Sequence, residues 1–252
     1  MYERLVHTTK KHYVDEGEGD TIILLYGLFG SVKNFETLIK HLKQKYRVII
    51  PVFPFYELGL SISIFTLTDF LHDLTRELEL EKFHLLGNSM GGHIALLYAL
   101  QYPEKIQSLI LSGSSGLYEN GMGESFPKRK DYNYIKTKTE ITFYDPHTAT
   151  RELVDEIFAT VNSRKAIQIL SLAKSTIHNN LRAELPNITA DCCLIWGRND
   201  VVTPPPVAME FNRLIPHSKL FWIDKCGHVP MLETPEVFNS LLDQFLTSLY
   251  EC

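Results

Sequence analysis

The sequence has no long apolar run and little sign of a membrane or secretory segment. Its longest apolar stretch, residues 21–29, contains Gly27 and is far shorter than the ~20 residues that a membrane-spanning helix needs. Residues 1–20 contain no apolar core of the kind that a secretory signal carries. We therefore expect a chain without a membrane span and with a cytoplasmic location.

Basic excess and cysteine patterns are also lacking. The 25 Lys and Arg residues are outnumbered by 30 Asp and Glu residues, which gives a net charge of −5. Such a chain has no overall attraction for phosphate backbones, so nucleic acid is not expected as a partner. The cysteines show neither a CxxC spacing nor a Cys/His metal pattern: Cys192, Cys193, Cys226 and Cys252. We expect reduced thiols and no bound metal.

Short apolar runs that alternate with amphipathic stretches fill most of the chain. This alternation predicts an α/β fold with a mostly parallel sheet covered by helices. Strands are expected at residues 21–26, 46–51, 83–86, 107–112, 192–197 and 220–224, with a weaker one near 12–16. Apolar stripes at helical spacing predict helices near residues 67–78 and 238–249. Pro235 is expected at the start of the second of these, and prolines at 204–206 open a further helix.

The alternation stops after Ser112 and returns at Cys192. Residues 113–138 are rich in Gly, Lys, Arg and Tyr and are expected to form a loop. Two helices are expected after it, near residues 150–161 and 164–179. The chain therefore divides into a core made of residues 1–112 and 188–252 and a helical insertion at 113–187.

The strongest chemical motif is GNSMG at residues 87–91, which fits G-x-S-x-G. An apolar strand run precedes it and a helix-like segment follows it. In that setting the chain turns sharply, the serine hydroxyl projects above the sheet and the next N–H begins a helix. We therefore predict that Ser89 is a nucleophile.

A serine hydroxyl needs a base within hydrogen-bond reach, and the base needs a carboxylate to orient it. His228, in KCGH at 225–228, and Asp200, in WGRND at 196–200, each follow a predicted strand. Sites in open α/β sheets gather at the carboxyl ends of strands, where both residues and Ser89 are expected. Asp224 and His93 are weighed as alternatives, and they are expected to be a solvated acid and a packed histidine.

These three motifs, in the order Ser, Asp, His, resemble the α/β-hydrolase superfamily over about residues 20–252, with the insertion similar to that superfamily's cap. They look most similar to the C–C bond hydrolases of meta-cleavage pathways. Related esterases, perhydrolase-like enzymes and hydrolase-fold receptors share much of the pattern. The resemblance implies an oxyanion hole made by the backbone N–H groups of Leu28 and Met90.

The chain departs from the family pattern at three places. Tyr26 stands where members usually carry His, and residues 52–61 lack the usual Asp-x-x-Gly and carry bulky aromatics instead. Val229 follows His228 where many C–C hydrolases have Trp. We expect a differently shaped loop beside the pocket. The changes at residues 52–61 and at Val229 also weaken the transfer of the C–C hydrolases' substrate class to this chain.

The sequence thus predicts a serine hydrolase that needs no cofactor and cleaves a small ester, thioester or related carbonyl substrate with an apolar body. C–C bond hydrolysis and acyl transfer with the same residues are the alternatives, and a ligand receptor with little turnover is a further one. A cationic clamp in the insertion would favour C–C cleavage. Arg164 is weighed for that role, and a surface charge at the start of a helix is the favoured interpretation of it. The oligomeric state, monomer or homodimer, is left open.

Overall fold

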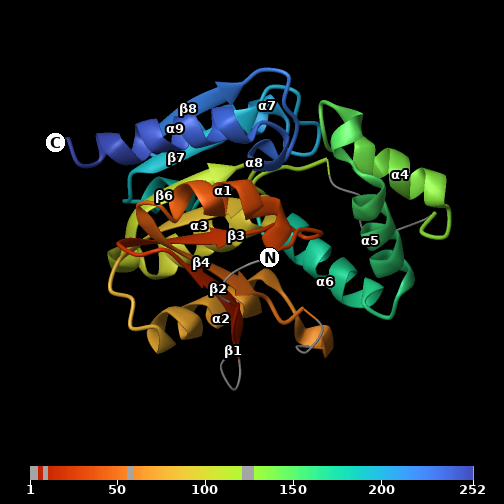
Figure 1. The fold of residues 1–252 in the computed structure, drawn as a ribbon, viewed down its shortest axis with the longest axis horizontal. Coiled ribbons are helices and arrows are strands. Elements are labelled where there is room, and N and C mark those ends of the chain that lie inside the picture. Colours follow the sequence, from red (N-terminus) through yellow and green to blue (C-terminus); the bar gives the residue numbers. More distant parts are fainter. Residues whose placement is uncertain (1–4, 8–10, 56–58, 121–127, 252) are drawn as a thin grey trace.

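The computed structural model describes residues 5–7, 11–55, 59–120 and 128–251. An eight-stranded sheet runs through this part of the chain in the order β1-β2-β4-β3-β5-β6-β7-β8 (Figure 1). The strands are β1 (Leu5–His7), β2 (His12–Glu16), β3 (Asp20–Leu25), β4 (Tyr46–Val52), β5 (Phe83–Asn88), β6 (Ile106–Ser112), β7 (Cys192–Gly197) and β8 (Ser218–Ile223).

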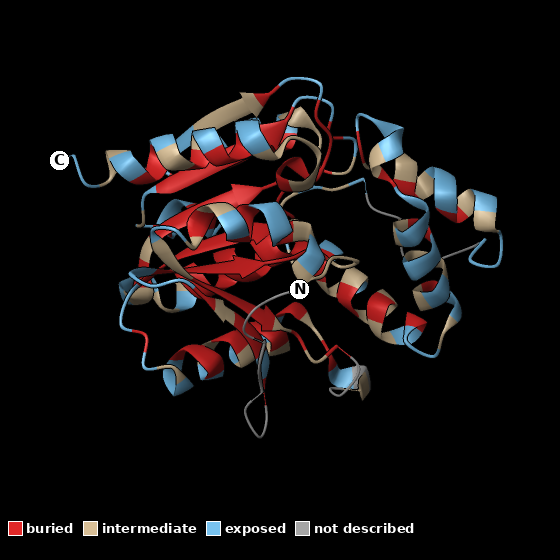
Figure 2. Ribbon diagram, in the orientation of Figure 1, coloured by how far each residue is buried: buried red, intermediate tan, exposed pale blue. Residues whose placement is uncertain are grey.

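The sheet is mostly parallel, as the sequence predicts. The six strands from β3 to β8 pair in parallel, while β2 pairs antiparallel with both β1 and β4. Every residue of β5 and β7 is buried, which is typical of strands that helices cover on both faces (Figure 2). Parallel pairing also brings the carboxyl ends of these strands to one edge of the sheet.

Helices cover both faces of the sheet (Figure 1). Helices α1 and α9 pack together, while α2 packs against α3 and α3 lies on β5 and β6. The helices of this core are α1 (Glu36–Leu42), α2 (Ile64–Glu77), α3 (Met90–Gln101), α7 (Pro205–Leu214), α8 (Pro230–Glu233) and α9 (Pro235–Ser248). Short 3-10 turns are η1 (Val32–Phe35), η2 (Gly59–Ser61), η3 (Pro103–Lys105), η4 (Pro146–Thr148) and η5 (Leu185–Asn187). None of the helices in the described residues is long and apolar enough to cross a membrane.

In the described residues between β6 and β7 the α-helices are α4 (Tyr132–Glu140), α5 (Arg151–Asn162) and α6 (Ala166–Ile177). Helices α5 and α6 lie where the sequence predicts them, but the expectation of a loop through residue 138 is wrong. Asp131 begins α4 by accepting a hydrogen bond from the Tyr134 N–H at 3.1 Å. Ile135 and Thr139, one turn apart, then give this short helix a buried side.

The α4–α6 segment has a small hydrophobic cluster of its own, separate from the core under the sheet. Its buried members are Ile135, Val161 and Ile169, one from each helix. Leu28, in the loop after β3, packs against both this cluster and the main core. The α4–α6 segment therefore meets the core beside the carboxyl end of β3.

Candidate active site

Ser89 lies at the turn between β5 and α3 with φ 56° and ψ −123°. A residue with a side chain adopts such a conformation at a cost of about 1–3 kcal/mol, so its surroundings must hold it there. The Ser89 N–H donates to the carbonyl of Ser112 at 3.1 Å, and the Ser89 carbonyl accepts from the N–H of Ser115 at 3.1 Å. These bonds tie the strained turn to the end of β6.

Glycines make room for this turn. A Cβ on Gly91 would collide with the backbone carbonyl of Leu25, and one on Gly87 would collide with Gly91 itself. A Cβ on Gly27 would lie only 3.0 Å from the Cβ of Ser89. The close approach of β3, β5 and α3 thus explains the small residues of the motif and leaves the Ser89 side chain on the surface of a cavity.

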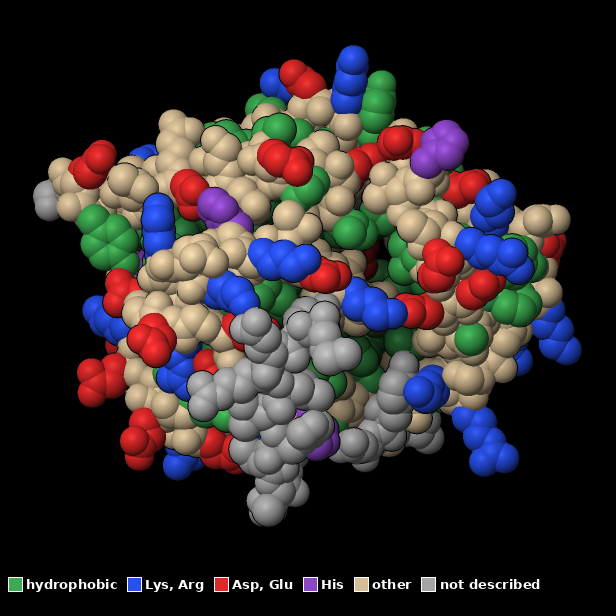
Figure 3. Space-filling view, viewed as in Figure 1, with side chains coloured by type: hydrophobic (Ala, Val, Ile, Leu, Met, Phe, Trp, Pro, Cys, Tyr) green, Lys and Arg blue, Asp and Glu red, His purple; other side chains and the backbone are tan. Residues whose placement is uncertain are grey.

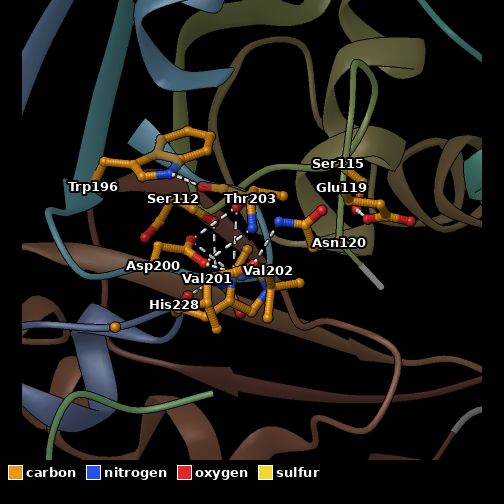
Figure 4. Close-up of polar contacts among 12 residues, drawn as sticks. Ser112, Ser115, Glu119, Asn120, Trp196, Asp200, Val201, Val202, Thr203 and His228 are labelled. Carbon is orange, nitrogen blue, oxygen red and sulfur yellow. Dashed lines mark hydrogen bonds and ion pairs between the residues drawn. The ribbon is translucent and has the colours of Figure 1, made fainter. Parts of the chain in front are cut away.

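His228 and Asp200 form a buried hydrogen-bonded pair (Figure 4). The Nδ1 of His228 lies 2.8 Å from Oδ2 of Asp200, and the two residues are only 5% and 2% exposed. The N–H of Val202, the N–H of Thr203 and the Thr203 hydroxyl also donate to Asp200, at 2.8, 3.0 and 2.8 Å. A carboxylate with this many donors is fixed in place and can orient the imidazole.

Opposing influences set the pKa of His228. Burial alone lowers it, but the charge of Asp200 and the hydrogen bond to Asp200 outweigh burial, and the charge of Glu119 adds to them. The net result is a pKa above the ordinary value of 6.5. The imidazole is therefore surrounded by groups that stabilise its protonated form.

The loop that carries His228 is fastened to two other segments. The amide of Asn88 donates to the carbonyls of Ser112 and His228 at 2.8 and 3.1 Å. The N–H of His228 donates to the carbonyl of Thr142, just after α4, at 2.9 Å. The side chain before the predicted nucleophile thus binds the backbone of the predicted base.

A cavity of about 220 Å³ lies between the sheet edge and the α4–α6 segment. Ser89, His228, Leu28 and Met90 all line it. Figure 3 shows a hollow with apolar side chains inside it between the two parts of the molecule. In the described structure Ser89 and His228 share this wall without a direct hydrogen bond between their side chains.

The backbone N–H groups of Leu28 and Met90 have no hydrogen-bond partner within the described residues. Met90 is the first residue of α3, where N–H groups lack a carbonyl partner inside the helix and the helix dipole is positive. Two donors without partners in this part of the chain therefore line the same cavity as the Ser89 side chain.

The alternatives considered from the sequence lie elsewhere. Asp224 is ion-paired with Arg198 at 2.7 Å, and its side chain is 81% exposed. His93 is completely buried, which lowers its pKa to about 4, and neither ring nitrogen has a hydrogen-bond partner among the described residues. Arg164 is exposed and is not among the described residues that line the cavity.

Sequence reasoning missed three side chains of the site: Asn88, Thr203 and Glu119. Thr203 follows Asp200 by three residues, a spacing at which an Asp side chain often accepts from a backbone N–H, so a signal for this local contact was present. Asn88 lies inside the serine motif, but G-x-S-x-G accepts any residue at this position, so the motif does not single it out. Nothing in the sequence marks Glu119, which follows an irregular loop after β6.

The two departures from the family pattern near residues 26 and 52 contact one another. The Tyr26 hydroxyl accepts a hydrogen bond from the Phe53 N–H at 3.0 Å, and its ring meets Phe53 and Phe55 edge to face. Tyr26 and the aromatic segment after β4 thus form one buried unit. Of the rest of the expected loop, residues 59–61 form η2 and residues 56–58 lie outside the described residues.

In the described ranges no group of three or more His, Cys, Asp or Glu side chains could hold a metal ion. The site brings together the Ser89 hydroxyl, a buried His–Asp pair and two N–H donors.

The comparisons with known proteins agree with this architecture. Residues 20–235 match the family described as the alpha/beta hydrolase fold. The chain is 30% identical to the 2-hydroxy-6-oxononadienedioate/2-hydroxy-6-oxononatrienedioate hydrolase 1 of Pseudomonas putida, over 94% of this chain and 91% of that protein.

Solved structures give the same result. An alpha/beta hydrolase enzyme from the metagenome of lagoon sediments at Mar Chica, Morocco, is 37% identical, with a TM-score of 0.81 over 98% of this chain and 99% of that one. A meta-cleavage product hydrolase from Pseudomonas fluorescens IP01 is 24% identical, with a TM-score of 0.81 over 94% of each chain, and shares the fold. The chain belongs to the α/β-hydrolase family.

Proposed function

We propose that this protein is a serine hydrolase in which Ser89 is the nucleophile, His228 the general base and Asp200 the group that orients the base. The observation that carries the proposal is the buried His228–Asp200 pair on the wall of the cavity that Ser89 lines. The strained backbone of Ser89 supports it, because strain is retained where a side chain must be aimed.

In this mechanism the Ser89 Oγ attacks a carbonyl carbon and Nε2 of His228 takes its proton. The N–H groups of Leu28 and Met90 stabilise the oxyanion, a role in which one lost donor costs about 10²–10³ in turnover. His228 then protonates the leaving group, and the acyl group stays on Ser89. Water, deprotonated by His228, releases the acid and restores the hydroxyl.

We propose C–C bond hydrolysis of an oxo acid as the first substrate class to test. The names of the 30% identical Pseudomonas putida protein and of further relatives support it. In this class the bond beside the carbonyl breaks, and the carbanion leaving group takes a proton from His228.

Ester hydrolysis is the second candidate, and the cavity wall favours it. No arginine is among the described residues that line the cavity, and the candidate clamp Arg164 is exposed outside it. Lys138 lines the cavity, but its ammonium lies 5.8 Å from the ring centre of Tyr134. A substrate carboxylate would therefore lack the bidentate partner that arginine supplies.

We further propose that residues 113–187 act as the cap of the site. Residues of α4, α5 and α6, among them Ile135, Ile157 and Thr176, line the cavity opposite Ser89. A movement of these helices would admit substrate and then exclude water from the acyl group.

The test compares the wild type with Ser89→Ala and His228→Ala on p-nitrophenyl esters and on a 2-hydroxy-6-oxo-dienoic acid, with fluorophosphonate labelling read by intact mass. We expect turnover to fall by several orders of magnitude in both variants and the label to be lost in Ser89→Ala. Ser115→Ala is the matched control, because Ser115 is the other serine among the described lining residues, and it should keep the label. A folded wild type with neither turnover nor label would refute the proposal.

A further inference from the structure

The cavity wall contains a carboxylate that the proposed mechanism does not use. Glu119 follows β6, is half-buried and lines the same cavity as Ser89 and His228. One of its oxygens accepts a hydrogen bond from the Ser115 hydroxyl (Figure 4), and the other lies 3.1 Å from the Thr176 hydroxyl, whose single proton it shares with the Ala173 carbonyl at 2.8 Å. These hydroxyls come from the loop after β6 and from α6, so both sides of the cavity hold the carboxylate in one position.

The charge of Glu119 is not neutralised by the described part of the protein. Among the described residues Glu119 takes part in no ion pair, and Lys138, the lysine of the cavity wall, has its ammonium against Tyr134. A carboxylate offers about four acceptor positions, and the two hydroxyls occupy two of them. Partial burial strengthens its interaction with any charge that enters the cavity.

Apolar side chains also lie on the exposed part of the cavity wall, beside polar ones such as Asn120 and Lys138. Ile141 after α4, Ile177 at the end of α6 and Val201 after β7 line the cavity, and they are 47%, 37% and 46% exposed. Side chains of this kind contact the apolar part of a substrate and make no hydrogen bonds to it. Glu119 is therefore placed to choose among substrates by charge.

We propose that Glu119 forms a subsite for a hydrogen-bond-donating group of the substrate, cationic or neutral, and that it disfavours a carboxylate there. The inference rests on the proposed serine hydrolase function and favours its ester candidate, because an oxo acid could bind only with its carboxylate away from Glu119. The substrate has an apolar body and one donor group, such as an ammonium or a hydroxyl. A dioate of the kind named for the relatives would bring like charge to Glu119.

The experiment uses two matched series of esters that differ only in a terminal group: carboxylate, hydroxyl or trimethylammonium. One series carries the group on the acyl chain of p-nitrophenyl esters. The other carries it on the alcohol of butyrate esters, with acid release followed by titration. Both halves of the substrate are thus tested, whichever faces Glu119.

Wild type, Glu119→Gln and the control Glu152→Gln are compared by kcat/KM. Glu152 is exposed on α5, so its substitution removes the same charge away from the cavity. In at least one series the wild type should prefer the cationic over the anionic ester by about tenfold or more, from Coulomb attraction at intermediate dielectric. The charge ratio is the kcat/KM for the cationic ester divided by that for the anionic ester. Glu119→Gln should bring this charge ratio close to one, chiefly through KM, and Glu152→Gln should leave it as in the wild type.

The amide that Glu119→Gln introduces has nearly the shape of the carboxylate, so a merely structural role would not move the charge ratio. Turnover that depends on Ser89, with the same charge ratio in wild type and Glu119→Gln for both series, overturns the inference and leaves the hydrolase function standing. Turnover that survives Ser89→Ala would overturn the proposed function instead. The two failures are therefore distinguishable.

Discussion

The hydroxyl of Thr203 shows how one residue that sequence reasoning passed over supports the site. It is completely buried and donates to Oδ2 of Asp200, the oxygen that also binds His228. We expect Thr203→Val to lower kcat/KM about three- to tenfold and stability by about 1 kcal/mol, because a buried acceptor loses one donor. Steady-state kinetics and urea unfolding measure the two effects.

Thr203→Ser is the matched control for this prediction. It keeps the hydroxyl and removes only a methyl group, so activity should return close to that of the wild type. An equal loss in Ser and Val variants would assign the effect to packing and contradict the role of the hydrogen bond.

His228 supplies a prediction about pH. The base works only when neutral, and Asp200 and Glu119 raise its pKa, so the acidic limb of kcat/KM should lie above pH 6.5. Glu119→Gln removes one negative charge and lowers this pKa, so the limb should move to lower pH. A limb that stays in place in Glu119→Gln would show that its charge does not reach the imidazole.

At this scale the sequence predicts the residues with a motif and misses those without one. Ser89, Asp200 and His228 follow strands in recognisable segments, so their meeting at one sheet edge could be predicted, while their catalytic roles stay predictions. Glu119 could not be predicted, because its position depends on contacts with α6, which is distant in sequence. The effect of Tyr26 needed the structure for the same reason.

At the scale of elements, one side chain joins the loop of His228 to the start of η4. Glu233 of α8 accepts from the Gly227 N–H at 2.6 Å and from the Asp145 N–H at 2.7 Å. An amide at this position has a single acceptor oxygen and cannot serve both donors. We expect Glu233→Gln to cost about 1–2 kcal/mol in the free energy of unfolding and to lower kcat.

Chemical denaturation and kinetics at saturating substrate test this prediction. Glu236→Gln, on the exposed side of the next helix, is the control and should stay within about 0.5 kcal/mol of the wild type. If both variants behave alike, the bridge from Glu233 does not hold the loop.

The contact of α3 with β3 gives a steric prediction. An added Cβ in Gly91→Ala meets the Leu25 carbonyl, so the helix must move, which costs about 1–3 kcal/mol or more. Gly59→Ala is the control: Gly59 has φ +62° and open space around its Cβ position, so only the conformational cost of about 1–2 kcal/mol applies. Thermal unfolding should rank Gly91→Ala as the less stable, and the reverse order would contradict this packing.

Most strands and helices could be predicted from the sequence. Buried strands of a parallel sheet are apolar throughout, and residues 192–197 and 83–86 show this clearly. Helix α4 was missed because it is short and polar, and only two of its residues are buried. Its formation depends on packing against α5 and α6, which no local pattern records.

At the scale of the whole molecule, the separate cluster of α4–α6 predicts uneven stability. This cluster has three buried apolar residues. The main core around the sheet holds most of the buried apolar side chains of the described chain. Leu172 ties α6 to the main core, so native-state hydrogen exchange should show the amides of α4 and α5 opening at least about 2 kcal/mol more easily than those of β5 and β6. Uniform protection across both parts would contradict independent opening.

Leu28 joins these two parts of the molecule. Its side chain packs against both clusters, and its N–H is one of the two cavity donors without a partner among the described residues. A displacement of α4–α6 would therefore also disturb the group proposed to stabilise the oxyanion. While α4–α6 is displaced, Ser89 would therefore react only slowly with molecules that reach it. The rate of fluorophosphonate labelling would report how much of the time the site is covered.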